Sequence, residues 1–408
     1  MTARRGASRH RWRTIPGSVW ALGLVSLFQD LSSEMVHSVL PLLLVNTLGA
    51  SVLLVGLIDG AAEATTAVAK VFSGGISDRL NSRKPLAVAG YGLAALTKPL
   101  FPLASGPAMV LGARMLDRFA KGVRGAPRDA MVADLTPPNL RGAAFGLRQA
   151  LDSVGAFAGP LAAIALMLGY SGSVRAVLWW AIVPAAVSAG LMIFAVREPK
   201  RTARADLERR SVWPFHRRDL MAFGRSFWTV TAVGSVLTLA RFSEAFLILS
   251  GQAAHLPASL TPLVLVAMNL VYAAASTPAG ALSDRLGRRG LLLAGIAALV
   301  AADTVLAIAR GPAAVMAGAA LWGLHMALTQ GIFAAMVADA APPSRRGTAF
   351  GVFNLITGAA IFASSAIAGI LWDAFGRSVA FAAGAAIAAT AFGAVMIVRL
   401  PRRLADEA

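Results

Sequence analysis

Apolar runs long enough to cross a membrane recur along this chain, and they limit its possible folds more than any other feature. Val174–Val196 and Val379–Val398 are two clear examples. A helix of about 20 apolar residues crosses a hydrocarbon core of roughly 30 Å. Charged residues make up only 14% of the chain, well below their share in soluble domains. The sequence therefore predicts an all-α protein embedded in a lipid bilayer.

The formal net charge of +18 would suit a nucleic-acid binder, but the positions of the basic residues argue against one. Arginine and lysine gather in alternate segments between the apolar runs, above all in 1–13 and 197–225. Cytoplasmic loops of membrane proteins carry such an excess, so both termini are predicted to be cytoplasmic. We expect a multi-pass monomer in a bacterial inner membrane, whose basic loops meet the lipid bilayer.

The alternating loops divide the chain into twelve predicted transmembrane helices in two bundles of six. The N-terminal bundle is predicted over 18–196 and the C-terminal bundle over 226–399. A cytoplasmic linker (197–225) joins them, and 1–17 and 400–408 form cytoplasmic tails. The predicted spans are 18–47, 52–77, 84–104, 107–133, 142–168, 173–196, 226–251, 258–283, 289–310, 312–338, 348–373 and 377–399.

The two bundles repeat each other in sequence. Ala133–Gly146 matches Ala338–Gly351, which lies 205 residues later. Gly74–Lys84 matches Gly280–Arg289 at nearly the same offset. Because each unit has an even number of spans, both enter the membrane from the same side, and the repeat is predicted to be parallel.

This organisation resembles the major facilitator superfamily of secondary transporters, whose signature between spans 2 and 3 reads G-x-x-x-D-R-x-G-R-K. The first copy departs from it by one extra residue and by Asn81 in place of glycine. The resemblance implies that this loop latches helices in one of two alternating states; the alternative is a plain basic turn. The residues concerned are Gly74, Asp78, Arg79, Arg83 and Lys84 in the first copy, and Gly280, Asp284, Arg285, Gly287, Arg288 and Arg289 in the second.

The first predicted span contains Asp30, Glu34 and His37, which share one helical face by their spacing. Ionisable residues inside a membrane usually serve a function. The resemblance implies that spans 1 and 4 line a central cavity, so the acidic groups are predicted to face Arg118 and Lys121 across it. Proton coupling, static ion pairing and direct substrate contact are the three alternatives for this stripe.

The fourth predicted span is unusually charged for a membrane helix. The segment Arg118–Gly122 resembles the family's R-x-x-Q-G motif, with Lys121 in the glutamine position. The resemblance implies a role for Arg118 in proton transfer. Its second-half counterpart keeps His325 and Gln330 without a basic cluster. The charged residues of this span are Arg114, Asp117, Arg118, Lys121, Arg124, Arg128 and Asp129.

The fifth predicted span begins with Arg148 and Asp152, an i,i+4 pair that can neutralise itself. Gly155, Gly159 and Pro160 follow and would allow close helix approach and a bend. This G-x-x-x-G-P segment resembles the motif that the family associates with antiporters. The alternative is ordinary packing of small residues.

The second half offers further polar residues in its predicted spans. Arg241 and Glu244 are predicted to form a cavity pair with either a gating or a structural role. Lys70 and Lys98, in the first half, are expected to snorkel towards the membrane surface. Candidates for substrate contact are Asn269, Gln330 and Asn354.

The sequence gives no sign of an enzyme, because it has neither a P-loop nor a nucleophile–base set. A metal site is an alternative for Asp30, Glu34 and His37, with Met35 nearby. Cysteine is absent, however, and the five histidines are scattered along the chain. We therefore expect no metal and no cofactor. The predicted function is a proton-coupled antiporter that exports small organic compounds. The alternative is import or export of one defined solute: a metal chelate, siderophore, metal ion or organic anion.

Overall fold

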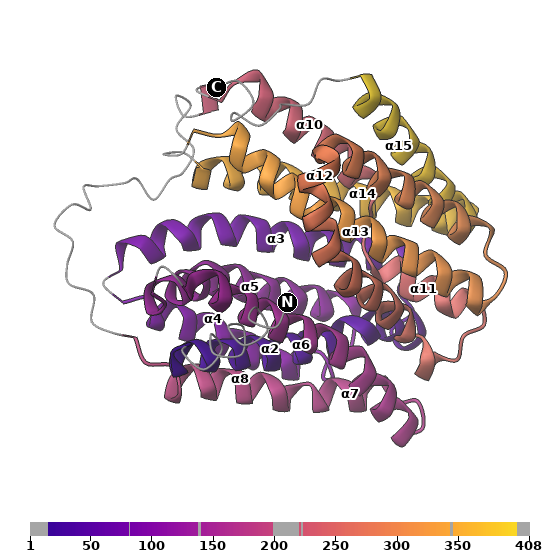
Figure 1. Ribbon diagram of the computed structural model, residues 1–408. Helices are drawn as coiled ribbons and strands as arrows, with labels where there is room; N and C mark the ends of the chain where they lie inside the picture. The colour runs from indigo at the N-terminus through magenta and orange to yellow at the C-terminus, as the bar shows by residue number, and fades with distance from the viewer. Residues whose placement is uncertain are drawn as a thin grey trace, which may run out of the picture.

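The computed structural model describes residues 15–80, 82–137, 140–198, 220–221, 223–342 and 346–397. Within helices, the side chains of 78, 79, 281 and 283–287 also lie outside the description. The predicted tails (1–17 and 400–408) and linker (197–225) therefore fall almost wholly outside these residues. The described part of the chain forms helices and short connections without a strand (Figure 1).

The first half begins with α2, which ends in a π-helical turn, η1. The short loop after η1 turns at Gly49, whose φ of 64° favours glycine. Ser51 and Ser173 then start the next helices by accepting hydrogen bonds from the backbone N–H groups of Leu54 and Ala176. The elements are α2 (Gly17–Leu42), η1 (Leu43–Thr47), α3 (Val52–Arg79), α4 (Lys84–Thr97), η2 (Lys98–Leu100), α5 (Pro107–Leu135), α6 (Arg141–Gly169), α7 (Val174–Trp180) and α8 (Ile182–Phe194).

The second half repeats this order of helices, except that one continuous helix, α12, supplies two successive spans. Met268 and Gly295 of α12 pack against neighbouring parts of α13, at Gly323 and at Leu328, so α12 supplies two spans. The elements are α10 (Arg225–Ala240), α11 (Ala245–Ala253), η4 (Ala258–Leu260), α12 (Leu263–Ile308), α13 (Pro312–Ala340), α14 (Arg346–Phe375) and α15 (Arg377–Ile397).

Within the described ranges, nine segments are long and apolar enough to cross a membrane. The other three predicted spans correspond to α2, α4 and α5. The helix α4 has only 14 residues, and α2 and α5 carry several ionisable side chains. The all-α membrane fold of twelve helices in two six-helix bundles is therefore confirmed, and the three helices outside these nine segments all belong to the first half.

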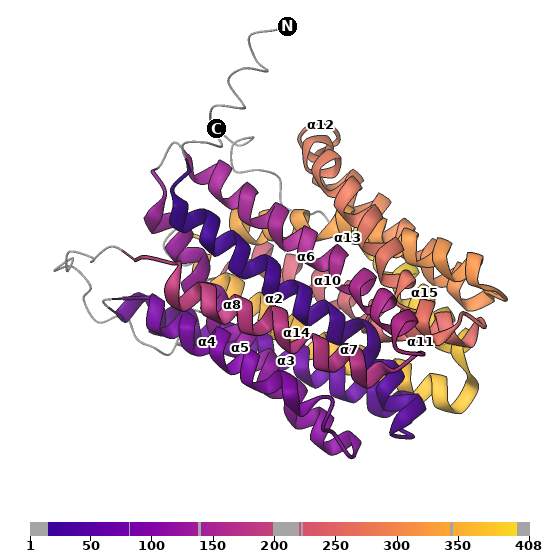
Figure 2. The same ribbon diagram turned by 90° about the horizontal axis from the view of Figure 1, so that it is seen from below.

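The two bundles lie side by side, with α3 running along α14 (Figures 1 and 2). Close contacts join them at the end where α3 begins and α14 ends, which we call the distal end. There, Gly56 approaches the backbone of Ser365, and Gly369 approaches that of Leu53. The Asp373 carboxylate accepts hydrogen bonds from the backbone N–H groups of Val52 (3.0 Å) and Leu53 (2.9 Å).

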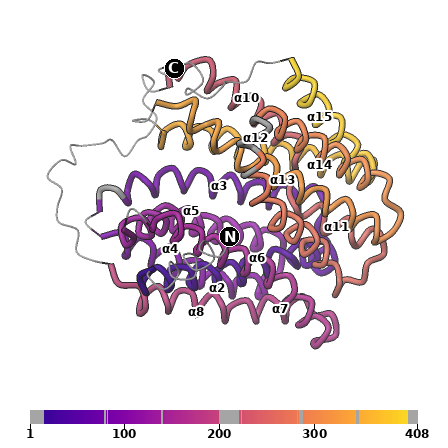
Figure 3. The backbone as a smooth tube through the Cα atoms, in the orientation of Figure 1, coloured from indigo at the N-terminus to yellow at the C-terminus, as the bar shows by residue number. Residues whose placement is uncertain are grey.

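The opposite end, where α3 ends and α4 begins, carries basic residues and is called the basic end. The tube in Figure 3 shows α3 and α14 continuing towards it. Lys70 of α3 lines the space between the halves and is exposed. The molecule is therefore closed at the distal end and open towards the basic end.

Candidate functional site

A central cavity of about 580 Å³ lies between the two halves. The first-half wall comes from α2, α3 and α5, and the second-half wall from α10, α13 and α14. The first-half wall is rich in ionisable side chains, whereas the second-half wall combines aromatic rings with amide and hydroxyl groups. This position, between two repeats and near the middle of the helices, is where transporters of this construction bind their substrates.

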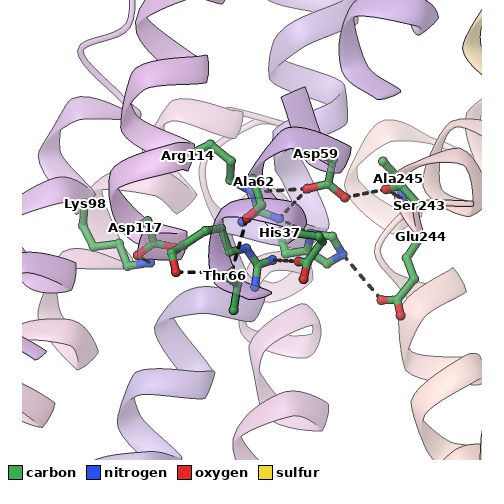
Figure 4. Close-up of polar contacts among 12 residues, drawn as sticks. His37, Asp59, Ala62, Thr66, Lys98, Arg114, Asp117, Ser243, Glu244 and Ala245 are labelled. Atoms are coloured by element: carbon green, nitrogen blue, oxygen red, sulfur yellow. Dashed lines mark hydrogen bonds and ion pairs between the residues drawn. The ribbon is translucent and has the colours of Figure 1, made fainter. Parts of the chain in front are cut away.

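The distal floor of the cavity is built around Arg114 of α5, whose side chain is fully buried (Figure 4). Its Nε and Nη2 atoms donate to Asp59 Oδ1, at 3.2 and 2.7 Å. Nη2 also lies 2.8 Å from His37 Nδ1. Because a guanidinium can only donate, His37 Nδ1 must accept, and the histidine proton lies on Nε2. That Nε2 atom faces Glu244 Oε2 at 3.5 Å.

The same floor joins the halves through a break in the seventh span. Residues 241–244 separate α10 from α11. Ser243 in this break donates from Oγ to Asp59 Oδ2, and its backbone N–H donates to Ser365 Oγ at 3.1 Å. Phe242 anchors the break, because the centroid of its ring lies 5.6 Å from that of Trp322 and 5.1 Å from that of Phe381. The polar floor is thus held by apolar packing on the second-half side.

One prediction about a basic residue was wrong. Lys98 does not snorkel: it is fully buried, and its Nζ atom lies 2.9 Å from Asp117 Oδ1. Glu34 lines the central cavity together with Arg118 and Lys121, but the ion pair of Arg118 is with Glu63 of α3, at 3.2 Å. The reason is that α5 packs mainly against α3 and only slightly against α2. Residue spacing predicted which face of α5 is polar, but it did not predict which helix lies opposite that face.

The predicted stripe on α2 is divided between two cavities. Glu34 and His37 line the central cavity, while Asp30 lines a second cavity of about 320 Å³ nearer the basic end. Glu34 and Lys121 line both cavities. Within the described part of the chain, the side chains of Glu34 and Lys121 have no hydrogen bond and no ion pair. Glu34 therefore links Asp30, in the second cavity, with His37, in the central cavity.

The second cavity contains an ion-pair network between α5 and α6. Arg148 Nη1 lies 2.6 Å from Asp152 Oδ2 and 3.7 Å from Asp129 Oδ1. Arg128 lies 3.0 Å from Asp129 and donates to Ser26 of α2 at 3.0 Å. The i,i+4 contact expected for Arg148 and Asp152 is present, but it belongs to this larger network.

On the second-half wall, Arg241, Glu244, His325, Gln330 and Asn354 all line the central cavity. Arg241 and Glu244 form no ion pair with each other in this structure, because Glu244 turns towards His37. The Nδ1 atom of His325 lies 2.8 Å from the Gly295 carbonyl oxygen and therefore donates to it. Gln330 accepts a hydrogen bond from the Tyr272 hydroxyl at 3.2 Å.

The remaining polar candidate, Asn269, lines the second cavity. Its Nδ2 atom lies 3.5 Å from the Ala156 carbonyl oxygen of α6, across the two halves.

The glycines of the predicted bend motif pack α6 against α2. A Cβ atom on Gly155 would lie 2.5 Å from the Leu27 carbonyl oxygen, and one on Gly159 would lie 2.5 Å from the Glu34 Cβ. Pro160 follows and is buried within α6. The motif therefore brings α6 close to the helix that carries Glu34.

The loop signature is only partly described. The side chains of Asp78, Arg79, Asp284 and Arg285 lie outside the described residues. Gly74 and Gly280 lie within α3 and α12. The described arginines of the signature form matching pairs in both halves: Arg83 Nε lies 3.6 Å from Asp134 Oδ2, and Arg288 Nη1 lies 2.5 Å from Asp339 Oδ2.

Asp59, Glu63 and Ser243 were missed as candidates. Asp59 and Glu63 stand four residues apart inside the predicted second span, which is the same signal that identified the stripe on α2. Ser243 gave no comparable signal. Among the residues that the structure describes, no group of three or more histidine and acidic side chains is placed to hold a metal ion.

Comparisons with known proteins agree with this architecture. A family model described as Major Facilitator Superfamily matches residues 22–253 and 231–407. An uncharacterised MFS-type transporter of Methanocaldococcus jannaschii is 30% identical over 375 residues, covering 88% of this chain and 89% of that protein.

Two further matches have either a low sequence identity or a short matched segment. The crystal structure of a mutant of the nucleoside transporter NupG superposes with a TM-score of 0.78 at 13% identity, covering 93% of this chain and 99% of that one. The multidrug resistance protein MdtH of Photorhabdus laumondii is 35% identical over 117 residues, which is 29% of each chain.

Proposed function

The chain belongs to the Major Facilitator Superfamily, and from this premise we propose that it is a proton-coupled antiporter that exports small organic compounds. The family match supports a multi-pass membrane transporter and gives no support for an enzyme. The substrate, the coupling ion and the direction of transport are our proposals. We also propose that it works as a monomer in a bacterial inner membrane, with the basic end and both termini in the cytoplasm.

Alternating access is supported by the different states of the two ends. The central cavity reaches solvent towards the basic end, while the distal end is sealed by contacts between α3 and α14. With the basic end in the cytoplasm, this structure is an inward-open state. Conversion to the outward-open state requires separation of Asp373 from the start of α3 and of Ser243 from Asp59.

Proton coupling rests above all on the position of Glu34. This carboxyl group lines the substrate-sized cavity and has no hydrogen bond or ion pair in the described part of the chain. A carboxyl group in that position can take a proton or the basic group of a ligand, but not both, which is the requirement for antiport. His37, one turn away, contacts Glu244 of the other half, so its surroundings change when the halves move.

Export is favoured by two weaker observations. The Gly155, Gly159 and Pro160 motif resembles one that the family associates with antiporters, and here it packs against Glu34. The second observation is the segment of 117 residues that is similar to MdtH, because the name of that protein describes multidrug resistance.

The proposal can be tested in respiring everted membrane vesicles that report their pH gradient by acridine orange quenching. Addition of ethidium, tetracycline or norfloxacin should release protons through the wild-type protein for at least one compound. Glu34→Gln should abolish this release. Glu198→Gln, which changes a carboxylate outside both cavities, should retain it. Uptake of the compound into the vesicles should also depend on the pH gradient. If this uptake is unchanged when the gradient is collapsed, proton antiport is refuted.

A further inference from the structure

The central cavity contains four ionisable side chains that lack a partner. Within the described residues, the side chains of Glu34, Lys70, Lys121 and Arg241 form no hydrogen bond and no ion pair, although all four line the cavity. The other charged lining groups differ, because Asp59, Glu63, Arg118 and Glu244 have the partners given above. Unpaired charges at membrane depth are costly, so these four are the groups that a ligand can compensate.

The four groups have both signs. Lys70 and Lys121 belong to the first-half wall and line both cavities, and Arg241 belongs to the second-half wall. Glu34 lies on the first-half wall and also borders both cavities. A ligand with an acidic group can therefore find cations on two walls, while a basic group can find a carboxylate.

The second-half wall adds an aromatic surface. The rings of Phe333 and Phe353 stack with centroids 6.2 Å apart and planes inclined by 29°. Gly234 makes room for them, because a Cβ atom there would lie 2.8 Å from the Phe353 ring. The amides of Gln330 and Asn354 lie on the same wall. Such a surface accepts a planar ring and can hydrogen-bond its polar edge.

We propose that the central cavity selects compounds that carry an acidic group and a basic nitrogen on an aromatic scaffold. The acidic group binds Lys70, Lys121 and Arg241, the basic nitrogen binds Glu34, and the ring lies on Phe333 and Phe353. A cavity of about 580 Å³ is in the range that holds small organic ligands.

This inference rests on the proposed function and gives it a mechanism. A basic nitrogen at Glu34 competes with a proton for the same carboxylate, so ligand and proton exclude each other. A purely acidic ligand would instead favour a protonated Glu34, and ligand and proton would bind together. A purely basic ligand would be repelled by Lys70, Lys121 and Arg241.

Three compounds with the same ring separate these cases: tryptophan carries both groups, tryptamine only the amine, and indole-3-propionate only the acid. Binding to the purified protein is measured by titration calorimetry and by the rise in melting temperature. Tryptophan should bind about tenfold or more tightly than either analogue, because each charge-assisted contact adds to affinity. Equal binding of tryptophan and one analogue, or no binding of tryptophan, would overturn the proposal.

Two variants test which charged group of the ligand binds Lys121 and which binds Glu34. Lys121→Gln should weaken the binding of tryptophan and indole-3-propionate by about tenfold and should not weaken that of tryptamine, because it also removes a repelling cation. Glu34→Gln should weaken the binding of tryptophan and tryptamine and should not weaken that of indole-3-propionate, because a neutral group at this position suits an acidic ligand. Lys84→Gln, outside both cavities, is the matched control and should change none, and melting temperatures without ligand report whether each variant folds. The reverse pattern would overturn the assignment.

These measurements are independent of transport. If the ranking holds while vesicles show no proton release, the proposed antiport fails and the ligand class stands. If protons are released with ethidium alone, and tryptophan does not bind, the ligand class fails and antiport stands.

Discussion

The helices α5 and α13 have the same length and occupy equivalent places in the two halves, yet their chemistry is opposite. Each has 29 residues, and α13 begins and ends 205 residues after α5. At the positions of Arg114, Asp117, Arg118 and Lys121, the second half has the apolar or small residues Ala319, Trp322, Gly323 and Met326. The first half therefore supplies most of the charges of the cavity, and the second half supplies its phenylalanine rings.

Other features are the same in both halves. Arg83 pairs with Asp134 as Arg288 pairs with Asp339, at the basic end of the fourth and tenth spans. Lys84 donates to the carbonyl oxygens of Ile193 and Val196, and its equivalent, Arg289, donates to that of Met396. The duplicated units thus share their scaffold contacts at the basic end and differ at the level of the cavity.

The sharpest test of this difference compares Lys98 with Asp303, its equivalent. Lys98→Met leaves Asp117 buried without its partner and should lower the free energy of unfolding by about 3–5 kcal/mol. Asp303 is fully buried, and neither of its oxygens has a partner among the described residues. Asp303→Asn replaces the carboxyl group by a neutral amide of the same shape, so no buried charge can arise there, and it should change stability by less than about 1 kcal/mol or raise it.

Stability can be measured for both variants by denaturant unfolding in mixed micelles. Equal losses for Lys98→Met and Asp303→Asn would show that the two halves bury charge in the same way. The double variant Lys98→Met/Asp117→Leu should recover most of the loss, because it leaves neither charge unpaired.

The second prediction concerns the packing of α6 on α2. Gly159→Ala places a Cβ atom 2.5 Å from the Glu34 Cβ and 3.0 Å from the Leu31 carbonyl oxygen. We expect a loss of about 1–3 kcal/mol from overpacking. The equivalent residue in α14 is Ser364, so the second half accepts a side chain at this position.

Gly146→Ala is the matched control in the same helix, because nothing lies within 4 Å of a Cβ atom there. It should be neutral or stabilise the protein by up to about 1 kcal/mol through helix propensity. A neutral Gly159→Ala would show that α2 and α6 can move apart without cost.

The third prediction concerns the distal seal, to which only one half contributes a carboxylate. Asp373 caps the start of α3, whereas its first-half equivalent, Leu168, is exposed. Loss of a helix cap costs about 1 kcal/mol. Asp373→Ala should therefore shift the equilibrium about fivefold towards the state that is open at the distal end.

Because the chain has no cysteine, spin labels can be placed cleanly at Thr47→Cys and Phe375→Cys, which flank the seal on opposite halves. Pulsed dipolar spectroscopy should show a larger fraction of long distances in the Asp373→Ala background. An unchanged distance distribution would mean that the packing of α3 on α14 closes the distal end without this cap.

The smallest expected effect is at Glu198, at the basic end of the first half. Partial burial tends to raise the pKa of Glu198, but hydrogen bonds from Ser82 and from the backbone N–H groups of Arg83 and Lys84 outweigh it, and the pKa is lowered. The stabilisation is therefore present above the ordinary pKa of about 4.3 and is lost as pH falls through the lower folded value.

Melting temperatures of the wild-type protein and Glu198→Gln should therefore converge as the solution is acidified. A difference between the two proteins that does not depend on pH would show that these hydrogen bonds do not favour the charged form of Glu198.

Much of the fold could be predicted from the sequence, because apolar runs, basic loops and a repeat constrain it independently. The helix pairings within the site could not. Spacing placed Arg118 on a face of α5, but only the packing of α5 on α3 makes Glu63 its partner. Lys98 looked like a residue near a membrane surface, and its burial depends on Asp117 from another helix.

The break in the seventh span has a mechanical consequence. An unbroken helix would act as a rigid rod, and any tilt at its distal tip would be transmitted to the wall of the cavity. The joint at 241–244 lets α11 pivot while α10 stays in place beside Phe353. The distal end can thus open by movement of α11 while a bound compound keeps its contacts with Phe353.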